Sequence, residues 1–185
     1  ALRRAALPWG RLADYLELTK PRLSSLVLMT TAVGCWRGQR TTAQLAMLLP
    51  VCLGTSLVVG GANALNQWME RGPDARMQRT RHRPLPSGRL APEAAFRFGL
   101  GLSVGGLVLL ATAVSMLSAC LAAVAWAIYL LVYTPMKRWT PLCTLVGAIP
   151  GALPPVIGWA GARHALDAQA AALFAILFVW QLPHF

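Results

Sequence analysis

Apolar residues along the chain gather into six long blocks, and most charged residues lie between the blocks. The blocks cover residues 23–36, 43–65, 98–117, 119–134, 142–160 and 168–185. None of them alternates apolar and polar positions as a transmembrane β-strand would. A helix needs about 20 residues to cross the hydrocarbon of a bilayer, and four blocks approach that length. The pattern therefore predicts an all-α, polytopic transmembrane helical bundle with six spans in this chain.

Two of the blocks have features that a straight transmembrane helix would not show. The first block is short, and we expect its helix to begin at residues 15–19, with Lys20 and Arg22 reaching out to the membrane surface. The fifth block contains three prolines, Pro150, Pro154 and Pro155. Proline removes a backbone donor and clashes with the preceding turn, so this helix should be bent or locally open. The bend is either a plain kink or the wall of a cavity, where free carbonyls find partners.

Small residues and cysteines within the blocks predict helix packing rather than chemistry. Small residues four apart allow membrane helices to approach closely. Such pairs occur at Gly34/Gly38, Gly101/Gly105 and Gly147/Gly151. The cysteines show no metal-ligand or disulfide spacing. We expect all four to be packing residues: Cys35, Cys52, Cys120 and Cys143.

The composition and the distribution of charge agree with a membrane protein. Hydrophobic residues make up 56% of the chain and charged residues only 12%, whereas soluble domains are about 25% charged. The net charge of +11 could suggest nucleic acid. However, six alternating crossings place 14 of the 17 basic residues on one side, leaving Arg37, Arg40 and Arg163 on the other. This bias follows the positive-inside rule and puts the N-terminus in the cytoplasm.

The chain has no linker, repeat or low-complexity segment, so residues 1–185 form one predicted domain. The basic N-terminal stretch runs into the first block without a small-residue cleavage site, and we expect no separate signal peptide. An Arg- and Ser-rich transit segment is also missing from it, which favours the bacterial inner membrane over the mitochondrial one. Phe185 ends an apolar block with no polar flank. We therefore expect a chain cut after its sixth helix.

Five polar side chains fall on one face of the second predicted helix and its continuation. At about 100° per residue they lie within an arc of roughly 100°. They are Asn63, Asn66, Gln67, Glu70 and Asp74. A stripe this polar at the end of a membrane helix should face a wet cavity. Mg²⁺ prefers oxygen ligands, so Asn66, Glu70 and Asp74 are the candidate metal ligands and catalytic residues. The alternative is a helix that simply becomes polar as it leaves the membrane.

Basic residues follow this stripe directly. Arg79 and Arg83 lie in the long loop after the stripe, and Lys137 and Arg138 lie in the next loop on the same side. Guanidinium groups bind phosphate through two parallel hydrogen bonds. Acidic groups for a metal beside basic groups for phosphate predict a site for a metal-bound diphosphate. For Lys137 and Arg138, a role as topology anchors remains equally open.

Several stretches resemble a known family. Residues 66–74 (NQWMERGPD) and 79–88 (RTRHRPLPSG) resemble the signature of the UbiA-type superfamily of intramembrane aromatic prenyltransferases. Residues 133–138 (YTPMKR), 147–159 (GAIPGALPPVIGW) and 180–185 (WQLPHF) are similar to its haem-specific branch, the protoheme IX farnesyltransferases (haem O synthases). Residues 18–22 (LTKPR) also fit, so the likeness covers nearly the whole chain.

The resemblance implies a fold of nine membrane helices around a central cavity, with Mg²⁺ as cofactor at Asn66, Glu70 and Asp74. It implies transfer of a farnesyl group from farnesyl diphosphate to a vinyl group of protohaem IX, converting haem B, the substrate, to haem O. The resemblance also implies a second acidic motif of the family beyond residue 185, so we expect the activity of the full protein and not of this chain alone. His184 is a candidate haem contact because imidazole is a common haem ligand. Downstream partners would be haem A synthase or the assembly of a haem–copper oxidase.

Two other interpretations remain open. The chain could prenylate a quinone precursor, as other branches of the same superfamily do. It could also be a membrane transporter with polar groups along its pathway, although the internal symmetry that is typical of transporters is not visible. A purely structural subunit would leave the polar stripe unexplained.

Overall fold

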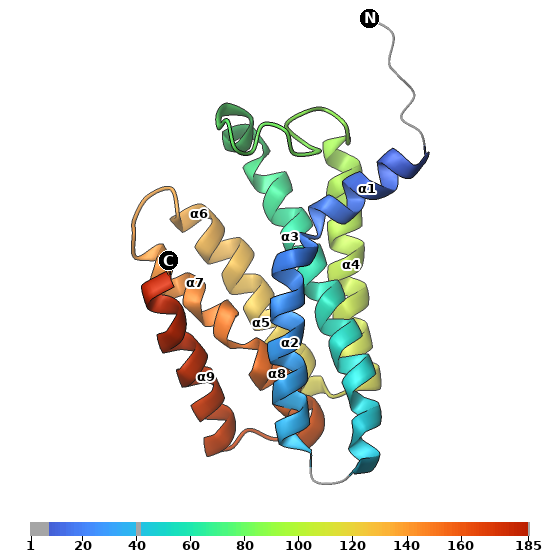
Figure 1. Cartoon of the computed structure of the whole chain (residues 1–185), viewed down its shortest axis with the longest axis vertical. Coiled ribbons are helices and arrows are strands. Elements are labelled where there is room, and N and C mark those ends of the chain that lie inside the picture. The colour runs from blue at the N-terminus through green and yellow to red at the C-terminus, as the bar shows by residue number, and fades with distance from the viewer. Residues whose placement is uncertain (1–7, 40–41, 185) are drawn as a thin grey trace, which may run out of the picture.

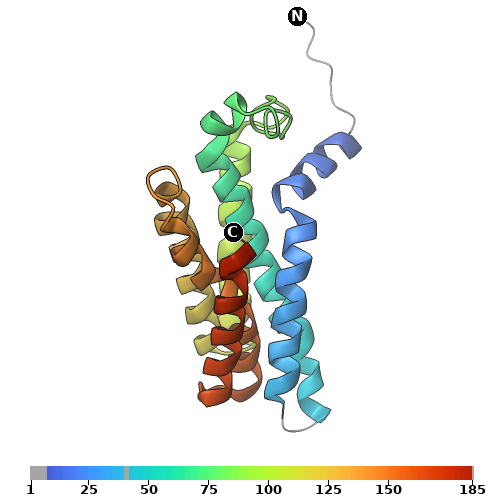
Figure 2. The same cartoon turned by 60° about the vertical axis from the view of Figure 1, so that its left-hand side comes forward.

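The computed structural model describes residues 8–39 and 42–184, and the regular elements within these ranges are all helices. In chain order they are α1 (Pro8–Leu18), α2 (Pro21–Gly38), η1 (Thr42–Met47), α3 (Leu48–Arg76), α4 (Pro92–Ala113), α5 (Met116–Ala127), η2 (Ile128–Tyr133), α6 (Thr134–Met136), α7 (Cys143–Ala152), α8 (Pro154–Arg163), α9 (Ala168–Gln181) and η3 (Leu182–His184). Figures 1 and 2 show the long helices running along one common axis, with α1 set at an angle to α2. The predicted all-α bundle is confirmed.

Four helical stretches are long and apolar enough to cross a membrane. They are Leu45–Arg76, Pro92–Ala113, Met116–Met136 and Cys143–Arg163, and α9 is a shorter apolar helix of 14 residues. The chain is therefore an integral membrane protein. Since α2 and α9 do not meet the same criteria, the count of six crossings stays a prediction.

The first helix does not extend back through residues 15–19, as we expected from the sequence. Lys20 has a left-handed backbone, with φ of 49°, and separates α1 from α2. Pro21 then opens α2, at a position where its missing N–H costs no hydrogen bond. The Lys20 side chain does not reach out to the membrane surface either, but points into the bundle.

Glycines allow close contact between helices, although not all those that the spacing suggested. A Cβ atom added at Gly34 would lie 2.0 Å from the Pro155 carbonyl oxygen, so α2 and α8 touch through their backbones. A Cβ at Gly61 would lie 2.6 Å from the Gly99 carbonyl oxygen, which joins α3 to α4 in the same manner. Gly101 and Gly105 have no atom within 4 Å of an added Cβ. The prediction that this pair packs is therefore wrong within the described chain.

The proline-rich fifth block is broken, as its sequence predicted. The helix stops at Ala152 and restarts at Pro154, with Leu153 between the two segments. Pro150 and Pro154 line the central cavity, while Pro155 packs against Gly34. The break thus forms part of a cavity wall, and it is also a packing contact. The four cysteines form no disulfide, and they differ in burial: Cys35 is buried, Cys52 and Cys143 are half-buried, and Cys120 is exposed, so the predicted packing role does not fit Cys120 within the described residues.

Candidate active site

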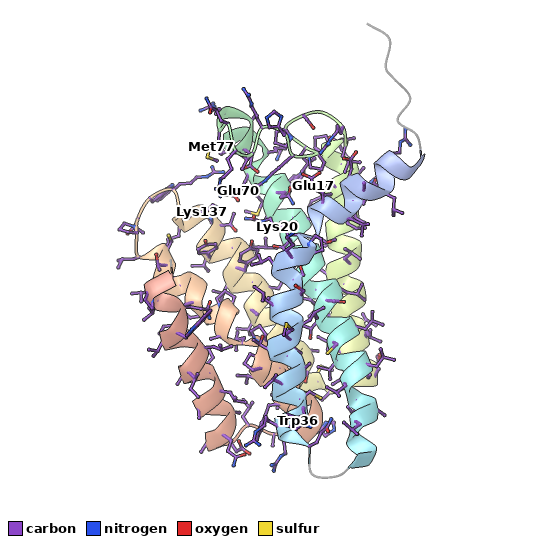
Figure 3. The ribbon with its side chains drawn as sticks, in the orientation of Figure 1. Glu17, Lys20, Trp36, Glu70, Met77 and Lys137 are labelled. Carbon is purple, nitrogen blue, oxygen red and sulfur yellow. The ribbon has the colours of Figure 1, made fainter. Side chains whose placement is uncertain are left out.

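A cavity of about 800 Å³ lies inside the bundle, between α2, α3, α5 with η2, α7 with α8, and α9. One end is charged and the remainder is lined mainly by apolar side chains. Figure 3 shows Lys20, Glu70 and Lys137 toward the same end of the molecule, with Trp36 at the opposite end. A long apolar hollow with a charged mouth would suit an amphipathic ligand that has an anionic head and a hydrocarbon tail.

The predicted polar stripe on α3 faces this charged end. Asn66, Glu70 and Asp74 line the cavity and are only 2%, 7% and 3% exposed. Asn63 also lines the cavity, although its amide donates to the Thr19 carbonyl at 3.1 Å. Gln67 is the exception, since its side chain turns to the end of α1 and donates to the Leu18 carbonyl at 3.0 Å. The stripe therefore splits between the cavity and the support of the α1–α2 junction.

Each of the three candidate ligands has a cationic neighbour. Arg83 Nη1 lies 2.7 Å from Asp74 Oδ2, and Lys137 Nζ forms an ion pair with Glu70 Oε1. Lys20 Nζ donates to Asn66 Oδ1 at 3.4 Å. These cations balance the carboxylates, which are buried and would otherwise be costly to ionise. The same cations could turn toward a phosphate if a metal took over the carboxylates.

Lys20 belongs to the site although the sequence did not single it out. Burial is the main cause, and the nearby positive charge of Arg83 the second, of a pKa that is lowered from 10.5 to about 8. A lysine in such a place is a strong anion-binding group, because an added negative charge would restore its proton affinity. The signals in the sequence were its position directly before Pro21 and its place in the stretch LTKPR, which resembles the family.

The predicted phosphate-binding residues gather at the charged end. Arg79, Arg83, Lys137 and Arg138 all line the cavity with Lys20, giving five cations against the two carboxylates of Glu70 and Asp74. The excess of positive charge favours an anionic ligand. Lys137 and Arg138 line the same cavity as Arg79 and Arg83 but come from a different part of the chain. A role in binding phosphate, as opposed to one as topology anchors, stays a prediction for these two residues.

Arg89 lies in the same loop but contacts α1 and does not line the cavity. Its guanidinium contacts Asp14 Oδ1 at 3.1 Å and Glu17 Oε2 at 2.9 Å, both on α1. It also donates to the His82 carbonyl at 3.1 Å. Arg89 therefore fastens the loop to α1 outside the cavity. The sequence predicted Arg83, and not Arg89, as a phosphate-binding residue, and of the two only Arg83 lines the cavity.

Aromatic side chains line the wall beyond the charged end. Trp126, Tyr129 and Tyr133 border the cavity, and the two tyrosine rings stack with centroids 5.7 Å apart. Such faces can stabilise a positive charge that develops on a ligand. Trp68 packs against Phe96 with centroids 4.9 Å apart, outside this cavity.

The three histidines contribute nothing to the described cavity lining. His184 lies in η3, but its side chain is outside the described residues, so its predicted haem contact stays a prediction. His82 is exposed in the loop, and His164 ends α8 with φ of 55°. Gln181, one turn before His184, reaches the cavity beside Gly151.

The oxygen donors on α3 fit Mg²⁺ in kind, and their spacing limits how they share it. No group of three His, Cys, Asp or Glu side chains is suitably placed among the described residues, so the Asn66 amide would have to contribute. Asn66 and Asp74 are eight residues apart, about 12 Å along a helix. Mg–O bonds are about 2.1 Å, so one ion cannot reach both. Glu70 lies one turn from each and could share an ion with either.

These features define a class of protein: an integral membrane helical bundle with an internal cavity suited to an anionic lipid-like substrate. The comparisons with known proteins then give its family. The model of the UbiA prenyltransferase family matches residues 27–185. The chain belongs to this family.

Curated relatives at high identity carry one common name. The chain is 50% identical over 181 residues to the protoheme IX farnesyltransferase of Solibacter usitatus (strain Ellin6076), covering 93% of the chain and 62% of the relative. It is 53% identical over 172 residues to that of Anaeromyxobacter sp. (strain Fw109-5), covering 93% and 58%. The chain thus spans about 60% of the length of these relatives.

A solved structure shares the fold. It is described as "Structural and mechanistic insights into the biosynthesis of Digeranylgeranylglyceryl phosphate synthase in membranes" and matches with a TM-score of 0.80. The match covers 92% of this chain and 60% of that chain, at 19% sequence identity. At this identity the likeness supports the helical architecture alone.

Proposed function

We propose that the protein containing this chain transfers a farnesyl group from farnesyl diphosphate to a vinyl group of protohaem IX, converting haem B to haem O. The observation that carries the proposal is the two-part cavity, with five cations and two carboxylates at one end and an apolar, aromatic-lined hollow beyond. The charged end suits a diphosphate, and the apolar part suits its isoprenoid tail. The name shared by the similar relatives, protoheme IX farnesyltransferase, supports haem as the acceptor.

The residues present account for departure of the diphosphate. When the bond between C1 of the prenyl chain and its oxygen breaks, negative charge grows on the diphosphate. Arg83, Lys137 and Lys20 lie at the charged end, and once they turn from their partners on α3 to the bound diphosphate they offset that charge. Mg²⁺, held by Glu70 with Asn66 or Asp74, would supply further positive charge beside the leaving group.

The remaining steps form the new bond. The allylic cation accepts the electron pair of the haem vinyl group, and the resulting cation takes up water with loss of a proton. The product carries a hydroxyalkyl link to the farnesyl chain, and inorganic diphosphate leaves. Tyr129, Tyr133 and Trp126 offer ring faces to the allylic cation. The apolar wall limits bulk water, which would otherwise hydrolyse the cation.

The proposed location follows from the charges. Arg79 and Arg83 of the loop after α3 lie at the charged end of the cavity, together with Lys137 and Arg138. Under the positive-inside rule this end faces the cytoplasm, and we place the protein in the bacterial inner membrane. Haem O would then serve haem A synthase or a haem–copper oxidase on the same membrane.

Analysis of cellular haems tests this proposal. Membranes from cells with and without the full-length gene are extracted, and the haems are separated and weighed by mass spectrometry. The proposal expects haem O only when the gene is present. Unchanged haem together with loss of a prenylated quinone would instead assign the protein to another branch of the family.

A further inference from the structure

Asn66 is buried against a residue that does not itself border the cavity. Its Nδ2 donates to Thr134 Oγ1 at 3.0 Å, and Thr134 is 1% exposed. Asn66 lines the cavity whereas Thr134 lies behind it. Any action of Thr134 on a ligand must therefore pass through the Asn66 amide.

The hydrogen bonds around Thr134 fix which way that amide points. Thr134 Oγ1 donates its proton to the Tyr129 carbonyl at 2.8 Å, so toward Asn66 the hydroxyl can only accept. On the other side, Lys20 Nζ can only donate and lies 3.4 Å from Asn66 Oδ1. A flipped amide would place an oxygen against an acceptor and an NH₂ group against an ammonium. Both neighbours therefore select the orientation that turns the oxygen toward the charged end of the cavity.

The backbone around Thr134 explains why its hydroxyl is available there. Residues 128–133 form a π-helical turn, and the Thr134 N–H bonds to the Tyr129 carbonyl, five residues back. Pro135 follows at once; proline lacks an N–H and clashes with the carbonyl four residues before it, which favours a widened turn. Such insertions are frequent at functional sites. Here the widened turn brings both the N–H and the hydroxyl of Thr134 onto one carbonyl.

The same segment reaches a second candidate ligand. Lys137, three residues after Thr134, forms the ion pair with Glu70, which is four residues after Asn66. Thr134 and Lys137, about one turn apart, thus contact Asn66 and Glu70, which are one turn apart on α3. Gly147 supports the segment from behind, since a Cβ there would lie 2.7 Å from the Tyr133 ring. The segment acts as a brace for the face of α3 that borders the cavity.

We infer that Thr134 is a positioning residue, which holds the Asn66 amide with its oxygen directed at a divalent cation bound with diphosphate. This inference rests on the proposed function for the identity of the site. Residues that orient metal ligands typically change metal affinity by about 10–100-fold when they are replaced. The Thr134 hydroxyl should have an effect of that size, and its methyl group should have little.

Mn²⁺ binding tests the inference without any need for turnover. The probe is Mn²⁺ with inorganic pyrophosphate, and free Mn²⁺ is measured by electron paramagnetic resonance with the full-length protein in detergent. Thr134→Val should weaken Mn²⁺ binding about tenfold or more. Thr134→Ser, which keeps the hydroxyl, should bind like the wild type. The valine variant should fold, because the backbone N–H of residue 134 still donates its hydrogen bond to the Tyr129 carbonyl. Thr134→Ala, which also lacks the hydroxyl, should bind Mn²⁺ as weakly as the valine variant. The thermal midpoint of each variant shows whether it is folded.

A double-mutant cycle separates positioning from a general structural effect. If Thr134 acts through Asn66, Asn66→Ala with Thr134→Val should bind Mn²⁺ no more weakly than Asn66→Ala alone. Wild-type affinity in Thr134→Val would overturn the inference, as would additive losses in the double variant or a wild type that binds no Mn²⁺. If the variants bind Mn²⁺ as expected but cells with the full-length gene make no haem O, the proposed function is refuted and the positioning role of Thr134 stands.

Discussion

Arg83 and Arg89 offer a matched pair for testing where the diphosphate binds. They lie six residues apart in one loop, but Arg83 borders the cavity and contacts Asp74 at 2.7 Å, whereas Arg89 contacts Asp14 and Glu17 on α1. Arg83→Lys keeps the charge and removes the planar pair of donors. Hydrogen bonds to charged groups contribute about 1.5–3 kcal/mol. Losing one such bond should weaken pyrophosphate binding by about 10–100-fold.

Isothermal titration of the full-length protein with inorganic pyrophosphate and Mg²⁺ measures this loss directly. Arg89→Lys serves as the control and should leave the affinity close to that of wild type, because Arg89 and its partners Asp14 and Glu17 lie outside the cavity. A thermal melt shows whether either variant is unfolded. Equal losses in the two variants would refute the reasoning that geometry, and not charge alone, places the diphosphate at Arg83.

Two further predictions test the packing and the topology. Gly34→Ala should destabilise the protein by about 1–3 kcal/mol in a detergent melt, since its Cβ would meet the backbone of α8. Gly101→Ala should be neutral, and equal melts would contradict the packing described. Single cysteines at exposed Ser87 and Ala165, in a cysteine-free background, should be labelled from opposite faces by a membrane-impermeant reagent. Labelling of both from outside would contradict the proposed orientation.

The sequence predicted the helical architecture well because apolar length is a strong signal. Blocks of nearly 20 apolar residues leave few alternatives, and the three prolines of the fifth block located its break. Spacing of small residues was less reliable. Gly34 and Gly101 both begin a GxxxG pair, but only Gly34 lies at an interface. The face of a helix that meets a neighbouring helix depends on the arrangement of the whole bundle, so the local spacing of glycines cannot predict it.

The residues of the candidate site were likewise predicted only in part. Asn66, Glu70 and Asp74 could be placed on one face because helical periodicity is local. Lys20 and Thr134 were missed because each acts through a contact 46 or 68 residues away in the chain. Both also depend on irregular backbone, a left-handed residue in one case and a π-turn in the other. The available signals were the prolines that follow them, at 21 and 135, and the family-like stretches LTKPR and YTPMKR that contain them.

Reconstitution of the purified protein tests the central claim most directly. The full-length enzyme in detergent is incubated with haem B, farnesyl diphosphate and Mg²⁺, and the haems are analysed by mass spectrometry beside an Asp74→Ala variant. The account predicts a haem heavier than haem B by one farnesyl group and one hydroxyl, formed only by the wild type and lost when Mg²⁺ is chelated. Equal product from Asp74→Ala, or no heavier haem from a folded wild type, would contradict it.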